Sequence, residues 1–299
     1  MSSTAEGIAR PRVATKTSEP ITARLSRGLS RGPLNAFLIL VGLFWLIPSF
    51  GLLITSFRTP ADYAESGWWT VFTTPAQLTM DGYTGLLQND SIMRALWNTV
   101  KISVPSSLLV VAVAALAAYA FAWVDFKGRD GLFLLVVAML VVPLQMALIP
   151  ASRLFNIMGV FGTIWAVIIF HVAFGLPFAI FLLRNFFAGI PKDLLEAARI
   201  DGASEFQIFF RLIIPLGMPA IASLLIFQFL WTWNDLLVGL TFGGNASPLT
   251  VLIRQEMRQY GTNIDVIAPG AFLLMIIPLI VFFAFQRYFV QGLLAGAVK

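Results

Sequence analysis

The sequence predicts an all-α membrane protein with six transmembrane helices and both termini in the cytoplasm. Of its 299 residues, 58% are hydrophobic and only 12% are charged, and soluble domains carry about twice that charged fraction. Apolar runs of about 20 residues recur along the chain, and each is long enough to cross a hydrocarbon core roughly 30 Å thick. Most lysines and arginines also fall on one side of these runs, which orients the bundle.

The composition excludes several kinds of chemistry. The chain has no cysteine, so thiol catalysis, a disulfide framework and cysteine-ligated metal are ruled out. Its single histidine, His171, argues against a multi-histidine metal site or a histidine-based triad. No phosphate-binding GxxxxGK[ST] loop is present. We therefore expect no catalytic residue and no metal site in this chain.

Two segments follow in order, a polar tail and a membrane domain. Residues 1–33 are rich in Ser, Thr, Arg and Pro, which predicts a disordered cytoplasmic tail. Residues 34–299 form the predicted transmembrane domain. Its second span is rich in alanine, which lets helix backbones approach closely, and Pro143 and other prolines are expected to kink their spans. The predicted spans cover residues 34–55, 98–122, 132–150, 161–183, 212–234 and 267–290.

The positive charges decide the orientation. If the N-terminus is inside, only six of the 20 lysines and arginines lie outside: Arg58, Arg94, Lys101, Arg153, Arg254 and Arg258. Because cytoplasmic loops carry the excess of these residues, both termini and residues 191–211 are predicted to be cytoplasmic. Residues 56–97 and 235–266 then form long outer loops.

Residues 191–211, called the island below, carry signals for two short helices. Pro191 suits a first helical position, and Gly202, after Asp201, can take the left-handed conformation that ends a helix. Ser204 and Gln207 have the spacing of a capping box that starts a second helix. The i, i+3, i+4, i+7 spacing predicts one apolar face. This face would consist of Phe206, Phe209, Phe210 and Ile213.

The end of the fifth span is unusually polar. Gln228, Trp231, Asn234 and Asp235 share a face by helical spacing. Such residues either bond neighbouring helices or line a solute path, where Trp stacking and amide hydrogen bonds would suit a sugar. Both interpretations stay open. For the mid-span His171 we expect an interhelical hydrogen bond rather than a transport role.

No predicted span other than the fifth, at its end with Asp235, contains an acidic residue. Ion-coupled carriers usually need buried carboxylates to hold their ion, so energy is expected to come from a partner. The island is the largest inner loop and is already shaped for docking.

The island also carries a specific motif. Its residues resemble the EAA loop of permease subunits in binding-protein-dependent ABC importers. The motif residues are Glu196-Ala197-Ala198, Asp201-Gly202-Ala203, Ile214-Pro215-Leu216 and Pro219. Residues 226–229, 233–235 and the ending 286–299 are similar to the sugar-uptake branch, that of the smaller maltose-type permease subunit. The segment Ser56-Phe57-Arg58 with Ser66-Gly67-Trp68-Trp69 resembles permeases for α-glucosides such as maltose or trehalose.

The resemblance implies the type I ABC importer permease fold in a bacterial plasma (inner) membrane. Three groups of residues would then have roles. The ATPase-coupling residues would be Glu196, Ala197, Ala198, Asp201, Gly202 and Ala203; the tail residues reaching the ATPases would be Gly296, Val298 and Lys299; and the loop entering the binding protein would contain Met257, Gln259, Tyr260, Gly261 and Asn263.

The resemblance implies partners as well. These are a second permease subunit in a heterodimer, two ATP-binding subunits and an extracytoplasmic sugar-binding protein. ATP and magnesium would be bound by the ATPase subunits, and this chain would hold no cofactor, bind no nucleic acid and contact lipid.

Other functions compete with this one. A secondary, ion-coupled sugar carrier predicts uptake that collapses with an uncoupler and survives ATP depletion. An ABC permease for a non-sugar solute such as glycerol phosphate would share the motif. A DNA-binding helix-turn-helix is disfavoured because acidic residues balance the island's Lys192, Arg199 and Arg211, and such a surface binds phosphates poorly. A non-transporting membrane scaffold need not co-purify with an ATPase.

Overall fold

The computed structural model describes residues 21–259 and 264–297. In these residues the chain is helical and contains no strand, apart from an isolated antiparallel bridge between Arg58 and Leu78. The α-helices are α1 (Ile21–Thr55), α2 (Pro60–Glu65), α3 (Asp81–Gln88), α4 (Asp90–Trp123), α5 (Arg129–Met139), α6 (Leu144–Ile157), α7 (Ile164–Phe187), α8 (Lys192–Ile200), α9 (Glu205–Ile208), α10 (Ile214–Trp233), α11 (Leu237–Phe242), α12 (Leu249–Gln259) and α13 (Ile264–Ala297). Short 3-10 helices cover Trp68–Phe72, Pro75–Gln77 and Gly244–Ala246, and a π-helical turn covers Phe209–Ile213.

The chain divides into two compact units, residues 1–51 and 52–299. The described part of the first unit is helical and belongs to α1, which begins at Ile21, inside the segment predicted to be a disordered tail. Residues 1–20 of that tail lie outside the described residues. From Gly32 onward α1 is long and apolar enough to cross a membrane, and large side chains such as Phe44 and Trp45 are exposed. Lipid or another subunit is the natural environment for such a helix.

Five helices of the described chain are single membrane-length segments, and a sixth span exists only as a bent pair. The five are Gly32–Thr55, Asp90–Trp123, Ile164–Phe187, Glu205–Trp233 and Val266–Gln286. They correspond to the first, second, fourth, fifth and sixth predicted spans.

The third predicted span, 132–150, is wrong as a continuous helix. Helix α5 ends at Met139, α6 begins at Leu144, and the two are bent by 103°. Pro143 lies at the break in an extended conformation, as expected for a residue without an N–H to donate. No residue of α5 is buried, so packing against other helices does not keep residues 132–150 in one straight helix.

The core of residues 52–299 is formed by α4, α7, α10 and α13, which pack against one another. Helices α4 and α7 share the most extensive contact. Ala114 and Ala118 of α4 and Ala179 of α7 are fully buried in the same cluster as Leu183 and Leu224. The alanine-rich second span therefore does pack closely, as its composition predicts.

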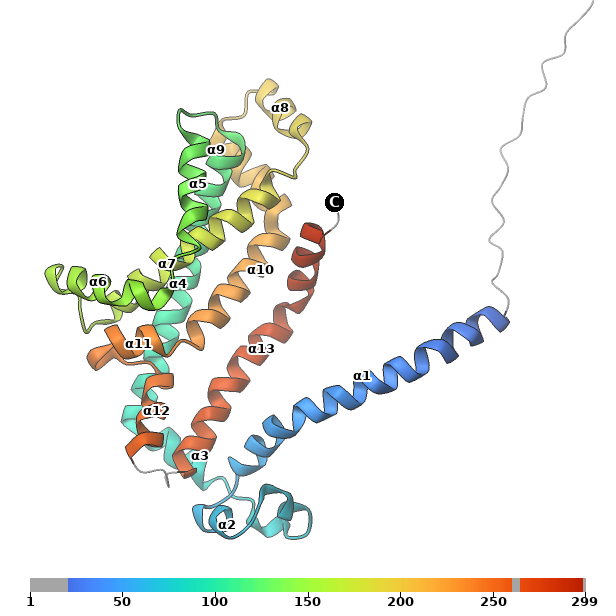
Figure 1. The fold of residues 1–299 in the computed structure, drawn as a ribbon, viewed down its shortest axis with the longest axis vertical. Helices are drawn as coiled ribbons and strands as arrows, with labels where there is room; N and C mark the ends of the chain where they lie inside the picture. Colours follow the sequence, from blue (N-terminus) through green and yellow to red (C-terminus); the bar gives the residue numbers. More distant parts are fainter. Residues whose placement is uncertain (1–20, 260–263, 298–299) are drawn as a thin grey trace, which may run out of the picture. The chain divides into compact units, whose positions relative to one another are not determined.

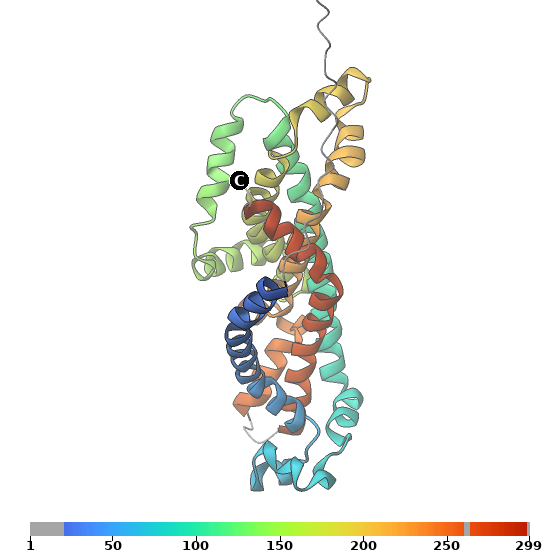
Figure 2. The ribbon, with the colours of Figure 1, turned by 90° about the vertical axis from the view of Figure 1, so that its right-hand side faces the viewer.

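The two ends of this unit carry different elements (Figures 1 and 2). At one end, α8 and α9 lie beside the turn between α4 and α5. At the opposite end lie α2 and α3. Helix α10 runs from the island end to α11, near the middle of the unit (Figure 1).

Candidate functional site

The island forms the elbow that its sequence predicts. Helix α8 ends at Asp201, and Gly202 follows with φ of 81°, in the left-handed region. Ser204 then starts α9 with a complete capping box: its Oγ accepts from Gln207 N at 3.4 Å, and Gln207 Oε1 accepts from Ser204 N at 2.8 Å. Pro191 is the residue before the first helical position rather than the first position itself. The turn and the cap are confirmed.

The predicted single apolar face of the second helix is wrong. Phe209 and Ile213 are 4% and 0% exposed, whereas Phe206 and Phe210 are 73% and 61% exposed. The cause is the π-helical turn at Phe209–Ile213, which inserts an extra residue and shifts the helical phase. Spacing rules that assume 3.6 residues per turn fail across such a turn.

The elbow is anchored in the bundle by apolar side chains. Leu195 of α8, Ile208 of α9 and Ile213 are almost fully buried. They belong to the same core cluster as Leu183 and Phe187 of α7. Burial of one such side chain stabilises by about 1.5–3 kcal/mol, so this anchoring is strong compared with the polar contacts nearby.

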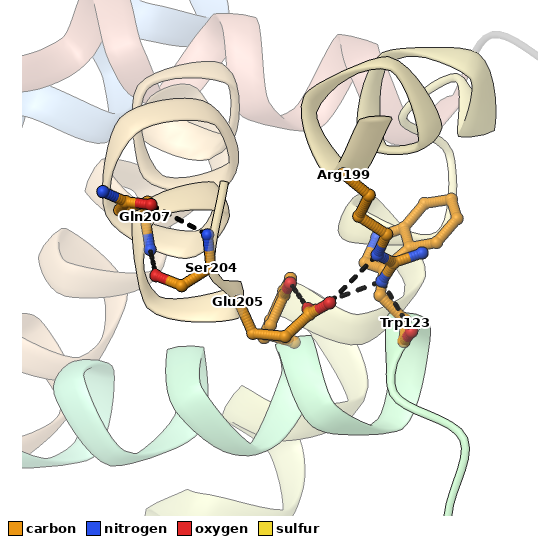
Figure 3. Close-up of polar contacts among 6 residues, drawn as sticks. Trp123, Arg199, Ser204, Glu205 and Gln207 are labelled. Carbon is orange, nitrogen blue, oxygen red and sulfur yellow. Dashed lines mark hydrogen bonds and ion pairs between the residues drawn. The ribbon is translucent and has the colours of Figure 1, made fainter. Parts of the chain in front are cut away.

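A polar network connects the elbow to α4. Glu205, the first residue of α9, receives hydrogen bonds from the Tyr119 hydroxyl of α4 and from Arg199 of α8 (Figure 3). Arg199 Nε lies 2.9 Å from Glu205 Oε1, and Arg199 Nη2 lies 3.4 Å from the backbone oxygen of Trp123, the last residue of α4. Trp123 Nε1 in turn donates to the backbone oxygen of Phe187 at 3.0 Å. One carboxylate thus joins α8, α9 and α4, and the Trp123 indole adds α7.

The outward side of α8 combines charges with exposed apolar groups. Ile200 is 85% exposed and Leu194 is exposed as well. Ala197 is exposed, whereas Ala198 packs partly against the core. Glu196 lies 2.8 Å from Lys192, whose hydrogen bond and charge lower the pKa of the Glu196 carboxyl. Of the predicted coupling residues, Ala198 faces the bundle and Glu196 and Ala197 face away from it.

The four polar residues predicted at the end of the fifth span occupy different environments. Gln228 is buried, its amide lies against Gly175 of α7, and it donates to Thr232 at 3.4 Å. Asn234 is exposed at the end of α10 and donates to its own helix, to Leu230 O. The solute-path role of these residues stays a prediction.

Asp235 organises the far end of α10. Its carboxylate accepts from Val238 N at 3.3 Å and Gly239 N at 2.9 Å, at the start of α11, and its backbone oxygen accepts from Thr250 at 2.6 Å. Its side chain is 11% exposed. The residue therefore ties α10, α11 and α12 together.

His171 does not make the hydrogen bond that the sequence suggested. Neither ring nitrogen has a hydrogen-bond partner among the described residues. Its Nε2 lies 3.6 Å from Asp235 Oδ2, and its ring meets Trp231 edge-on at 5.3 Å between centroids. The contact is between helices, as expected, but it consists of ring packing on Trp231 and proximity to the Asp235 carboxyl group.

The segment after α1 is built around a buried arginine. Arg58 donates to the backbone oxygens of Asp62 and Ser66 and to Ser66 Oγ at 2.6–3.1 Å. The two motif pieces around Arg58 and Ser66 are therefore in direct contact. Trp69 is exposed beside them.

The remaining predicted site residues are described only in part. Met257 is exposed on α12, and Gln259 is the last residue of that helix. Gly296 lies in α13. Tyr260, Gly261, Asn263, Val298 and Lys299 lie outside the described residues.

The residues that hold the elbow to the bundle were not predicted from the sequence. No role was expected there for Glu205, Tyr119 or Trp123. These residues are separated by more than 70 positions in the chain, so no local pattern connects them. An aromatic residue with a polar tip at the end of an apolar span is the one signal that pointed toward them.

Membrane-length helices with an anchored polar elbow between two of them are the architecture of a multi-pass membrane protein. The chain belongs to the family of binding-protein-dependent transport system inner membrane components, whose profile matches residues 110–295. It is therefore a multi-pass protein of the bacterial inner membrane and a transport component.

Two relatives and one solved structure refine this assignment. The chain is 47% identical to the osmoprotective compounds uptake permease protein GgtD of Synechocystis over 89% of this chain and 92% of GgtD. It is 48% identical to the alpha-glucoside transport system permease protein AglG of Rhizobium meliloti, over 76% of this chain and 62% of AglG. The fold matches a chain in the crystal structure of a bacterial ABC transporter that imports the polysaccharide alginate. There the TM-score is 0.72 and the identity 22%, over 92% of this chain and all of the other.

Proposed function

We propose that this chain is a permease subunit of an ATP-driven carbohydrate importer, forms half of the translocation pore, and couples to the ATPase subunits through the island. In this role the chain hydrolyses nothing, and the ATPase partners bind ATP and magnesium. A second permease subunit, two ATP-binding subunits and an extracytoplasmic sugar-binding protein complete the assembly. Residues Met257–Asn263 would meet the binding protein, and the C-terminal residues would reach the ATPases.

The observation that carries the proposal is the outward side of α8. Leu194 and Ile200 are exposed on a helix that stands outside the membrane-length segments. Exposed apolar side chains rimmed by charges are typical of a surface that binds another protein. Behind them, buried Leu195 and the Glu205 network fix the helix to the bundle, so that force applied to α8 would reach the spans.

The substrate proposal comes from the relatives and the outer motif. AglG is named for α-glucoside transport, and the contact between Arg58 and Ser66 links the two motif pieces that suggest the same branch. We therefore propose a di- or oligosaccharide of the maltose, trehalose or α-glucoside type. The name of GgtD favours a second candidate, an osmoprotective solute.

Co-purification tests the docking role. The change is Glu196→Lys, which places a positive charge on the outward side of α8. We expect the variant to insert in the membrane but to recover less ATPase subunit after detergent extraction. The matched control is Asp130→Lys, which makes the same charge change at an exposed site on α5 at the same end of the bundle. Equal ATPase recovery for both variants would contradict the docking role.

Reconstitution tests the substrate. The complete importer would be placed in proteoliposomes, and ATP hydrolysis would be measured with a panel of α-glucosides, other sugars and osmoprotective solutes. We expect stimulation by an α-glucoside in the presence of the binding protein. Stimulation only by a non-sugar solute would replace the sugar proposal, and uptake that survives ATP depletion would replace the ABC mechanism.

A further inference from the structure

Glu205 lies where the two short helices of the elbow meet α4. It is the first residue of α9, and its two oxygens are shared between Tyr119 of α4 and Arg199 of α8. Arg199 also reaches the backbone of Trp123, at the last turn of α4 (Figure 3). The Phe209 ring packs on the Tyr119 ring at 5.4 Å. Polar and aromatic contacts therefore join the elbow to the same turn of α4.

These contacts have a geometric rather than an energetic role. The Arg199 and Glu205 side chains are 36% and 48% exposed, and ion pairs that open to solvent contribute little to stability. A carboxylate held by donors from two helices nevertheless fixes the angle between them, because both hydrogen bonds are satisfied in only a narrow range of orientations. Their loss is expected to change how the elbow is held without unfolding the chain.

The connection from the elbow to α10 is built differently. Between α9 and α10 the chain forms the π-helical turn Phe209–Ile213. Pro215 lies in the first turn of α10 and Pro219 one turn later, and neither has an N–H for the helical ladder. π-turns and prolines are the positions at which helices bend. Residues 209–219 therefore depart from the regular α-helical hydrogen-bond ladder, whereas the elbow and α4 are joined directly by side chains.

We propose that Glu205 is a positioning residue that locks the elbow to α4, so that movement of the island drives α4 while α10 bends at residues 209–219. This inference rests on the proposed function, since it concerns the force that an ATPase partner would apply to α8. Tyr119 and Arg199 are the two attachments through which Glu205 acts. The exposed residues of α8 would bind the partner. Glu205 would transmit the resulting movement of the island to α4.

The first test separates coupling from assembly. The complete importer would be reconstituted with Glu205→Gln, with Tyr119→Phe, and with the control Lys127→Gln in the α4–α5 turn. For Glu205→Gln we expect normal recovery of the ATPase subunits and continued ATP hydrolysis, while solute uptake per ATP falls by about tenfold. Tyr119→Phe should lower the same ratio less, and the control should leave it unchanged. An unchanged ratio in both network variants would overturn the proposal.

A charge exchange keeps the test informative if Glu205→Gln alone disturbs folding. The double variant Arg199→Glu with Glu205→Arg restores an ion pair between α8 and α9. We expect it to recover part of the uptake ratio lost in Glu205→Arg alone. No recovery, with the complex fully assembled, would count against a positioning role for this pair.

Distance measurements test the locking directly. Because this chain has no cysteine, spin labels can be attached at Asp193→Cys on α8 and Lys127→Cys beside α4 without removing native thiols from it; the partner subunits would be used in cysteine-free form. We expect the distance between them to stay the same in nucleotide-free and ATP-bound importer, and to become broadly distributed when Glu205→Gln is added. A distance that changes with ATP in the chain with intact Glu205 would overturn the proposal. Failure of the proposed function would look different, because no ATPase subunit would then bind.

Discussion

The chain carries one hydrogen-bonded carboxylate before α10, on α9, and another directly after α10, and the two lie in opposite surroundings. At the island end, Glu205 is about half exposed and its partners are the charged Arg199 and the Tyr119 hydroxyl. At the other end, Asp235 is 11% exposed, and its partners are two backbone N–H groups of α11, with His171 nearby. The first network joins separate helices through long side chains. The second network caps the helix that follows in the chain.

This difference in exposure and partners indicates that the Asp235 network mainly stabilises the fold, whereas the Glu205 network mainly orients the elbow. A buried carboxylate that satisfies backbone N–H groups is costly to remove, because those groups are left without partners. Breaking an exposed ion pair changes the free energy of unfolding little. We therefore expect such a pair to act mainly by orienting the helices that it joins. We therefore expect changes at Asp235 to affect stability first and changes around the elbow to affect coupling first.

The largest effect on stability is expected for Asp235→Ala. The change leaves Val238 N and Gly239 N without their acceptor and should lower the free energy of unfolding by about 3 kcal/mol. Thermal unfolding of the purified chain in detergent would measure this. The control Asp235→Asn keeps an oxygen acceptor and should lose clearly less. An equal loss of unfolding free energy in the two variants would show that the unpaired N–H groups of Val238 and Gly239 do not cause the destabilisation.

The next effect is expected at the elbow itself, for Gly202→Val. The left-handed conformation at Gly202 costs a β-branched residue about 1–2 kcal/mol or more. A Cβ there meets no atom within 4 Å, so the effect comes from the backbone and not from a collision. We expect the variant to reach the membrane but to lose ATP-driven uptake. Full uptake would argue against the elbow angle as a determinant of coupling.

A smaller effect is expected for Ser204→Ala, which removes the side-chain half of the capping box. Loss of such a cap costs about 1 kcal/mol, and the start of α9 should fray. Hydrogen exchange of the Gln207 amide would detect this locally, with Ser204→Asp as the control because aspartate caps equally well. Unchanged protection in Ser204→Ala would mean that tertiary packing alone holds the turn.

The smallest effect is expected for the Lys192–Glu196 pair. Lys192 lowers the pKa of Glu196, so the contribution of the pair is present above the ordinary glutamate pKa and is lost as the pH falls through the lowered value. The Lys192 and Glu196 side chains are 70% and 49% exposed, and ion pairs open to solvent contribute little, so we expect no measurable change in the unfolding midpoint for Lys192→Gln at neutral pH. The pKa of Glu196 should rise toward its ordinary value in that variant. Carboxyl NMR would measure it, and an unchanged pKa would contradict the contact.

The island was predictable because its signals are local. The Gly202 turn and the Ser204–Gln207 capping box are each encoded within four residues, and both formed as expected. The phase of the helix after Gln207 was not predictable, because the π-turn at Phe209–Ile213 depends on how α9 and α10 together meet the core. Local sequence signals determine the turn and the start of α9. Packing against the core determines which apolar side chains of the elbow are buried.

The third span shows the limit of hydropathy. Residues 132–150 are apolar enough to cross a membrane, and Pro143 was expected to kink them, yet the segment bends by 103°. Pro177 of α7 is also internal to a span but is buried in a continuous helix. The extent of packing decides whether a proline bends a helix or breaks it, and packing partners cannot be read from one segment. The same holds for Tyr119 and Glu205, which meet only in the folded bundle.

Accessibility of α8 tests the central claim most directly. A single Asp193→Cys variant would be treated with a membrane-impermeant maleimide in spheroplasts and in inverted membrane vesicles, with and without the ATPase partner bound. The account predicts labelling only in inverted vesicles, and protection when the partner is present. Labelling from the outer side, or equal labelling in the presence of the partner, would contradict it.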